Sequence, residues 1–63
     1  MDNKRFTQRR KELGLTQTQL CHGICTQATL SKFERQGRTP SLAILEQLCH
    51  RLGVSVESLD ESN

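Results

Sequence analysis

Residues 19–34, QLCHGICTQATLSKFE, predict a bend between two short helices rather than one continuous helix. Gly23 supplies the backbone freedom that a tight turn requires, and Thr26 carries a side-chain oxygen that can cap the first turn of a helix. Leu30 and Phe33 follow at helical spacing, which marks the buried face of the second helix. The segment therefore has the form helix, tight turn, helix.

Cap signals set the bounds of these two helices. Thr16 and Gln19 have the spacing of a capping box, so the first of the two begins after Thr16 and ends near His22. The second covers about residues 27–35. Together they predict a helix-turn-helix unit over about residues 16–35.

The N-terminal part of the chain predicts one more helix, over about residues 3–13. Phe6, Arg10 and Leu13 recur at i, i+4 and i+7 in a segment free of glycine and proline. Gly14 follows at the position where a left-handed C-cap is expected.

The C-terminal part predicts a fourth helix and one last helical turn. Ser41 caps the fourth helix and Gly53 ends it, whereas Ser55 caps the final turn. The apolar residues of these two elements are Leu42, Leu45, Leu48, Cys49, Leu52, Val56 and Leu59. Residues 60–63, DESN, are expected to form a polar tail.

Length and composition indicate a single all-α domain over residues 1–63. Three cysteines, an odd number, favour reduced thiols over a disulfide framework. The chain has no apolar run long enough to span a membrane and its N-terminus lacks the apolar centre of a signal peptide, so we expect a cytoplasmic protein. No catalytic triad, facing carboxylate pair or glycine-rich phosphate loop can be placed, so we predict neither an enzyme nor a bound cofactor.

Charge is distributed unevenly along the chain. Residues 1–40 carry eight Lys or Arg and three Asp or Glu, a balance of +5, whereas residues 41–63 carry one against four, a balance of −3. The N-terminal half is therefore the half that would attract a polyanion.

Four segments resemble the helix-turn-helix domain of Cro and phage-repressor-like (XRE) bacterial transcription regulators. They are LTQTQL (15–20), LSKFE (30–34), TPSL (39–42) and LGVSVESL (52–59), and the resemblance extends over residues 4–60. It implies a compact, five-helix, lambda-repressor-like domain that binds duplex DNA sequence-specifically and regulates transcription. Because one such domain offers a small footprint on DNA, we expect a homodimer.

Two departures from the family pattern concern the loops. The turn CHGICTQ (21–27) is one residue shorter than the commonest form, which resembles regulators of the Rgg and PlcR type. In those regulators the DNA-binding domain precedes a peptide receptor, so the resemblance implies a further C-terminal effector domain. Gln36 stands where a glycine usually follows the residues ER, and Gly37 comes one place later, so the loop before the fourth helix is expected to differ locally.

The family resemblance implies that the helix at 27–35 enters the major groove. The side chains that would then face base edges are Gln27, Ala28, Thr29 and Lys32. Gln27 can pair bidentately with adenine, a methyl of Ala28 or Thr29 can contact thymine, and Lys32 can reach guanine or a phosphate. The alternative is an exposed helix face with four solvated side chains.

Phosphate contacts are expected from Gln17, because the first turn of a helix has free backbone amides and a positive dipole end. The further candidates are Arg5, Arg9, Lys11, Thr26, Arg35 and Arg38. Their alternative role is that of ordinary solvated side chains.

Arg10 and Glu34 are predicted to form a structural ion pair. Arg10 shares the apolar stripe of the first helix with Phe6, and Glu34 lies one turn beyond Leu30 on the apolar face of the third helix. The family resemblance implies the same pair.

Two other kinds of binding site are alternatives to DNA recognition. One is a metal or redox site built from Cys21, His22, Cys25, Cys49 and His50, but the spacing is poor for structural zinc, and buried reduced thiols explain Cys21 and Cys49, so we predict no metal site. The other is a protein-protein interaction module of the same fold.

Overall fold

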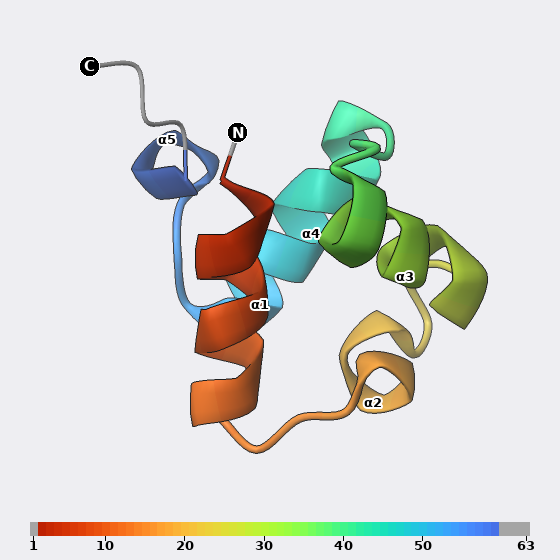
Figure 1. Cartoon of the computed structure of the whole chain (residues 1–63), viewed down its shortest axis with the longest axis horizontal. Helices are drawn as coiled ribbons and strands as arrows, with labels where there is room; N and C mark the ends of the chain where they lie inside the picture. Colours follow the sequence, from red (N-terminus) through yellow and green to blue (C-terminus); the bar gives the residue numbers. More distant parts are fainter. Residues whose placement is uncertain (1, 60–63) are drawn as a thin grey trace.

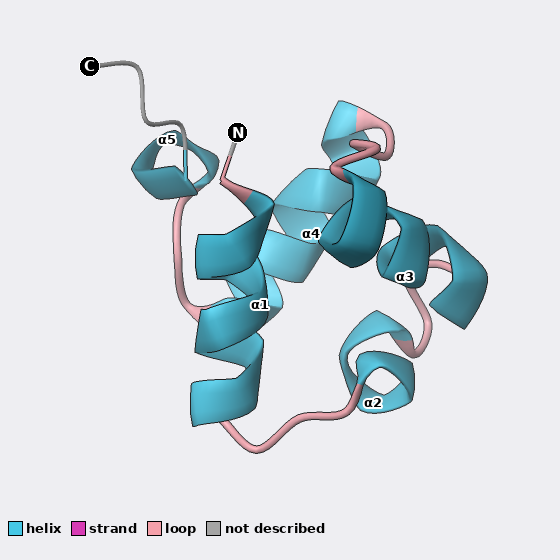
Figure 2. Ribbon diagram, viewed as in Figure 1, coloured by secondary structure: helices cyan, strands magenta, loops and turns pink. Residues whose placement is uncertain are grey.

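Capped helices make up most of the backbone (Figures 1 and 2). The computed structural model of the chain describes residues 2–59. The element order is α1 (Asn3–Glu12), α2 (Gln17–Cys21), α3 (Gln27–Gln36), α4 (Leu42–Leu52) and α5 (Val56–Leu59). No strand occurs within this part of the chain, so the all-α prediction is confirmed. The predicted polar tail at 60–63 lies outside the described residues.

Side-chain oxygens cap the helices where the sequence predicts them. The backbone N–H of Gln19 donates to the Thr16 hydroxyl at 3.1 Å. The backbone N–H of Thr16 donates to the side-chain oxygen of Gln19 at 2.9 Å, which completes the capping box. The Thr26 hydroxyl accepts the backbone N–H of Thr29 at 3.2 Å at the start of α3. Ser41 caps α4 in the same way.

The displaced glycine after α3 lengthens that helix by one residue. Gly37 has φ of 71°, a left-handed conformation that favours glycine, and it ends α3 after Gln36 rather than after the predicted Arg35. The loop before α4 therefore differs from the family pattern in that α3 ends one residue later.

Apolar side chains from all five helices form one core. Its buried members are Phe6, Leu20, Cys21, Leu30, Phe33, Leu45, Leu48, Cys49, Leu52 and Leu59. The rings of Phe6 and Phe33 meet edge to face with centroids 4.9 Å apart, which packs α1 against α3.

Two leucines assigned to buried stripes lie at helix ends instead. Leu13 is 42% exposed at the C-cap of α1, and Leu42 is 62% exposed at the first residue of α4. Their helical spacing with Phe6 and with Leu45 predicted buried positions, and that prediction is wrong, because each of the two leucines stands at the end of its helix.

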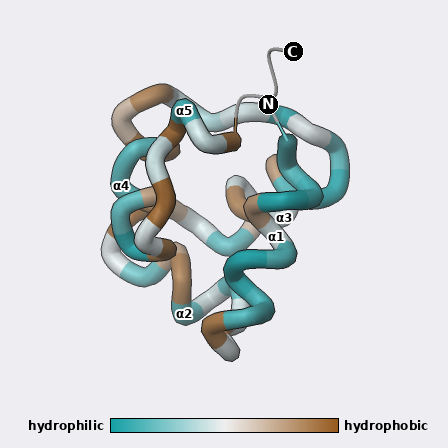
Figure 3. The backbone as a smooth tube through the Cα atoms, turned by 90° about the vertical axis from the view of Figure 1, so that its left-hand side faces the viewer, coloured by the Kyte–Doolittle hydropathy of each residue, from teal (hydrophilic) through white to brown (hydrophobic). Residues whose placement is uncertain are grey.

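Helix α1 is largely hydrophilic along its length (Figure 3). Its buried residues are Phe6 and Arg10. Residues 2 and 59, the two ends of the described part of the chain, lie side by side, because the Asp2 amide donates to the Leu59 carbonyl at 2.8 Å and so joins the start of α1 to α5. None of the helices in residues 2–59 has the length and apolar character needed to span a bilayer.

The core predicts a sharp contrast between two leucines. Leu30→Ala empties a site of 0% exposure, so it should lower the free energy of unfolding by about 2–5 kcal/mol. The control Leu42→Ala removes an exposed side chain and should cost less than about 1 kcal/mol. Urea unfolding followed by circular dichroism measures both, and equal losses would contradict this description of the core.

Candidate nucleic-acid interface

Arg10 and Glu34 form a two-pronged ion pair between α1 and α3. Arg10 Nε donates to Glu34 Oε2 at 2.7 Å, and Nη2 donates to Oε1 at 2.9 Å. The remaining guanidinium nitrogen, Nη1, donates to the carbonyl of Leu15 at 2.7 Å. The side chains are 11% and 4% exposed, so the pair predicted from the sequence is present and largely buried.

The surroundings of Glu34 keep its carboxylate ionised. Burial alone would raise its pKa, but the hydrogen bonds from Arg10 and Gln17 and the charge of Arg10 outweigh burial, and the pKa of Glu34 lies below its usual value. The carboxylate form is therefore the form that the fold stabilises.

Two glutamines extend this ion pair to the start of α3. Gln17 Nε2 donates to Glu34 Oε1 at 3.0 Å, and Gln27 Nε2 donates to Gln17 Oε1 at 2.6 Å. Arg10, Glu34, Gln17 and Gln27 thus form a hydrogen-bonded chain that runs from α1 to the C-terminal part of α3, then to α2, and back to the first residue of α3. Sequence reasoning selected all four residues but did not predict that the two glutamines are joined.

The N-terminal half of α3 presents the predicted base-reading side chains outward. Gln27, Ala28 and Lys32 are exposed, and Thr29 is half-buried with its hydroxyl 2.9 Å from that of Thr26. Leu30 and Phe33 occupy the opposite, buried face of the helix. We call the surface formed by residues 27–29 and Lys32 the α3 face.

The predicted phosphate ligands do not all lie beside the α3 face. Arg35 and Arg38 are exposed at the end of α3 and just after it. Arg9 instead donates from Nε to the Leu52 carbonyl at 3.1 Å, at the end of α4. Arg5 donates to the Ser58 carbonyl in α5 at 3.0 Å. The side chains of Arg5 and Arg9 are therefore bonded to α5 and α4 rather than to α2 or α3.

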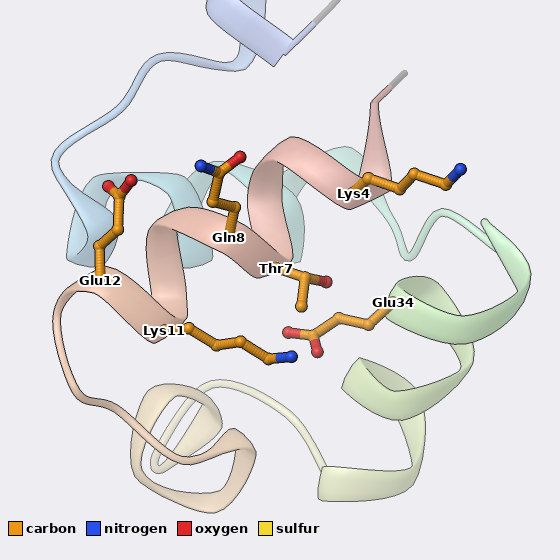
Figure 4. A pocket seen from close by; sticks show the side chains of 6 residues that line it. All are labelled: Lys4, Thr7, Gln8, Lys11, Glu12 and Glu34. Atoms are coloured by element: carbon orange, nitrogen blue, oxygen red, sulfur yellow. The ribbon is translucent and has the colours of Figure 1, made fainter.

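An open groove of about 600 Å³ runs between α1 and α3 beside the ion pair (Figure 4). Its lining residues are Lys4, Thr7, Gln8, Lys11, Glu12 and Glu34. Five of these residues belong to α1 and Glu34 belongs to α3, so the groove borders the buried pair.

The three cysteines are free thiols in or beside the core. Cys21 and Cys49 are buried, and Cys25 is half-buried. Burial raises the pKa of the Cys49 thiol, and burial together with the neighbouring Cys21 raises that of Cys25. Within residues 2–59, no three His, Cys, Asp or Glu side chains gather closely enough to hold a metal ion.

Comparison with known proteins adds one match. A family model described as helix-turn-helix matches residues 7–59, which includes α2, the turn and α3. The searches of curated proteins and of solved structures gave no match.

The pKa of Glu34 predicts a pH-dependent contribution to stability. Because its folded-state pKa is lowered, the stabilisation is present above the unfolded value, about 4.3, and is lost as pH falls through the folded value. Glu34→Gln should therefore lower the free energy of unfolding by about 1.5–3 kcal/mol at neutral pH, with the difference from the parent shrinking in acid.

Urea titrations at neutral and acidic pH measure this difference. Glu46→Gln is the matched control, because Glu46 is an exposed carboxylate on α4. A loss in Glu34→Gln that is the same at both pH values would contradict a role for the ionised pair.

Proposed function

Because the chain belongs to the helix-turn-helix family of Cro/C1 type, a family of DNA-binding domains, we propose that it binds duplex DNA sequence-specifically and regulates transcription. In this proposal α3 enters the major groove and the α3 face meets base edges. The observation that carries the proposal is the hydrogen-bonded chain that ends on Gln27, an exposed side chain at the first residue of α3.

The hydrogen-bonding groups that Gln27 has left suit adenine. Its Nε2 gives one hydrogen to Gln17, which leaves its second N–H and its carbonyl oxygen for a partner. Adenine offers an N7 acceptor and an N6 donor in the major groove, which match that remaining donor and acceptor. Gln17 thereby holds Gln27 in a conformation that needs little further ordering on binding.

Backbone contacts would come from residues around the α3 face. We assign phosphate contacts to Gln17 and Thr26, which stand at the start of α2 and α3, and to the exposed Arg35 and Arg38. Arg9 is left out, because its guanidinium is bonded to a carbonyl of α4.

A single domain of this size offers a small DNA footprint. We propose that two copies bind as a homodimer to half-sites about one helical turn of DNA apart, which gives the specificity that one copy lacks. The cytoplasm is the compartment in which such a regulator would act.

Base reading predicts a change of sequence preference without a loss of folding. Gln27→Ala should relax the preference at one base pair in each half-site, at about 1–3 kcal/mol per lost contact. Selection from random duplex DNA measures the preference, and circular dichroism checks the fold. Gln47→Ala is the matched control, because Gln47 is an exposed glutamine on α4. Unchanged preferences in Ala variants of Gln27 and Lys32 would contradict base reading and favour a protein-binding module.

Phosphate neutralisation predicts a steep dependence on salt. Affinity for duplex DNA should fall as salt rises, and Arg38→Met should reduce the slope of log affinity against log salt by about 1. Arg9→Met should leave the slope nearly unchanged, because Arg9 is engaged with α4. Fluorescence anisotropy with a labelled duplex gives the slopes. An affinity that does not respond to salt would rule out binding through the phosphates.

A further inference from the structure

Arg51, in the last turn of α4, reaches across to the end of α2. Its Nη1 donates to the carbonyl of Leu20 at 2.8 Å and to the carbonyl of His22 at 2.7 Å. Arg51 is also the one Lys or Arg in residues 41–63 of the sequence. The one cation of the acidic half is thus bonded to the helix-turn-helix unit.

The tight turn explains why the Leu20 carbonyl needs a donor. In a continuing α-helix the Ile24 amide would donate to Leu20, but here it donates to the Cys21 carbonyl at 2.9 Å. The Cys25 amide donates to the same Cys21 carbonyl at 3.0 Å. Gly23, with φ of 78°, then redirects the chain toward α3. The guanidinium of Arg51 supplies this missing donor and also donates to the carbonyl of His22.

We propose that Arg51 is a positioning residue for DNA recognition: by holding the turn against α4, it sets where the α3 face stands relative to the core. This inference rests on the proposed function. The turn leads directly into Thr26, the N-cap of α3, and into Gln27, its first residue. A displacement of the turn therefore moves Gln27 away from Gln17, with which it shares a hydrogen bond of 2.6 Å.

Arg9 is a matched control for this role. Like Arg51, it donates from its guanidinium to the carbonyl of a residue at the end of a helix, here Leu52 of α4. Arg9→Met therefore removes one positive charge, as Arg51→Met does, together with the bond to the Leu52 carbonyl, but it leaves both bonds from Arg51 to the turn between α2 and α3 in place.

The experiment compares Arg51→Met, Arg51→Lys and Arg9→Met with the parent at fixed salt. We expect Arg51→Met to weaken binding to the selected duplex about tenfold while folded, and Arg9→Met to weaken it less than about threefold. Arg51→Lys, which keeps a charged donor, should restore most of the affinity and remains informative if Arg51→Met unfolds. Amide hydrogen exchange should speed up over residues 20–27 in Arg51→Met but not in Arg9→Met.

The outcomes separate this inference from the proposed function. A parent protein that binds no duplex overturns the proposed function and the recognition role of Arg51 with it. A parent that binds, with Arg51→Met binding equally well or with Arg9→Met weakened as much, overturns the positioning role alone. Loss of binding in Arg51→Met with unchanged exchange at residues 20–27 also overturns it.

Discussion

The buried ion pair between Arg10 and Glu34 joins parts of the fold that apolar packing alone would hold weakly. Helix α1 buries Phe6 and Arg10, and each of them contacts α3, Phe6 through the ring of Phe33 and Arg10 through Glu34. The same side chain satisfies the Leu15 carbonyl in the loop that leads to α2. Desolvation offsets part of the gain from a buried pair, but loss of either partner would leave a charge stranded in the core region. The pair therefore specifies one arrangement of α1, α2 and α3.

That arrangement divides α3 into two faces with different tasks. Leu30 and Phe33 face the core, and the residues on the opposite side are exposed at the N-terminal half of the helix. Gln17 connects the faces, because it bonds both to buried Glu34 and to exposed Gln27. A constraint set in the interior is in this way transmitted to a side chain that we propose reads bases. Arg51 adds a second constraint from the side of α4.

Local signals were enough to predict the helices and the ion pair. Thr16, Thr26 and Ser41 mark helix starts because a side-chain oxygen can satisfy amides of its own first turn, a property of three or four consecutive residues. The ion pair was predictable because Arg10 and Glu34 each interrupt an otherwise apolar face.

Contacts between distant segments were beyond such signals. The carbonyls to which Arg9 and Arg51 donate lie 43 and about 30 residues away in the chain. Every residue has a backbone carbonyl, so the pattern of side chains does not indicate which one will accept a hydrogen bond. Leu13 and Leu42 fitted a helical stripe, yet periodicity does not report where the neighbouring helix ends. The link between Gln17 and Gln27 depends on the angle of the turn, which no single residue type specifies.

Whether α3 reads the bases of duplex DNA can be tested by a nuclear magnetic resonance titration of isotope-labelled protein with a duplex selected by the protein itself. If α3 reads the bases, the largest chemical-shift changes should occur at the side-chain amides of Gln17 and Gln27 and at the backbone amides of the α3 face, while the signals of α5 should not change. Shifts concentrated on α4 and α5, with the Gln27 side chain unaffected, would contradict base reading by α3.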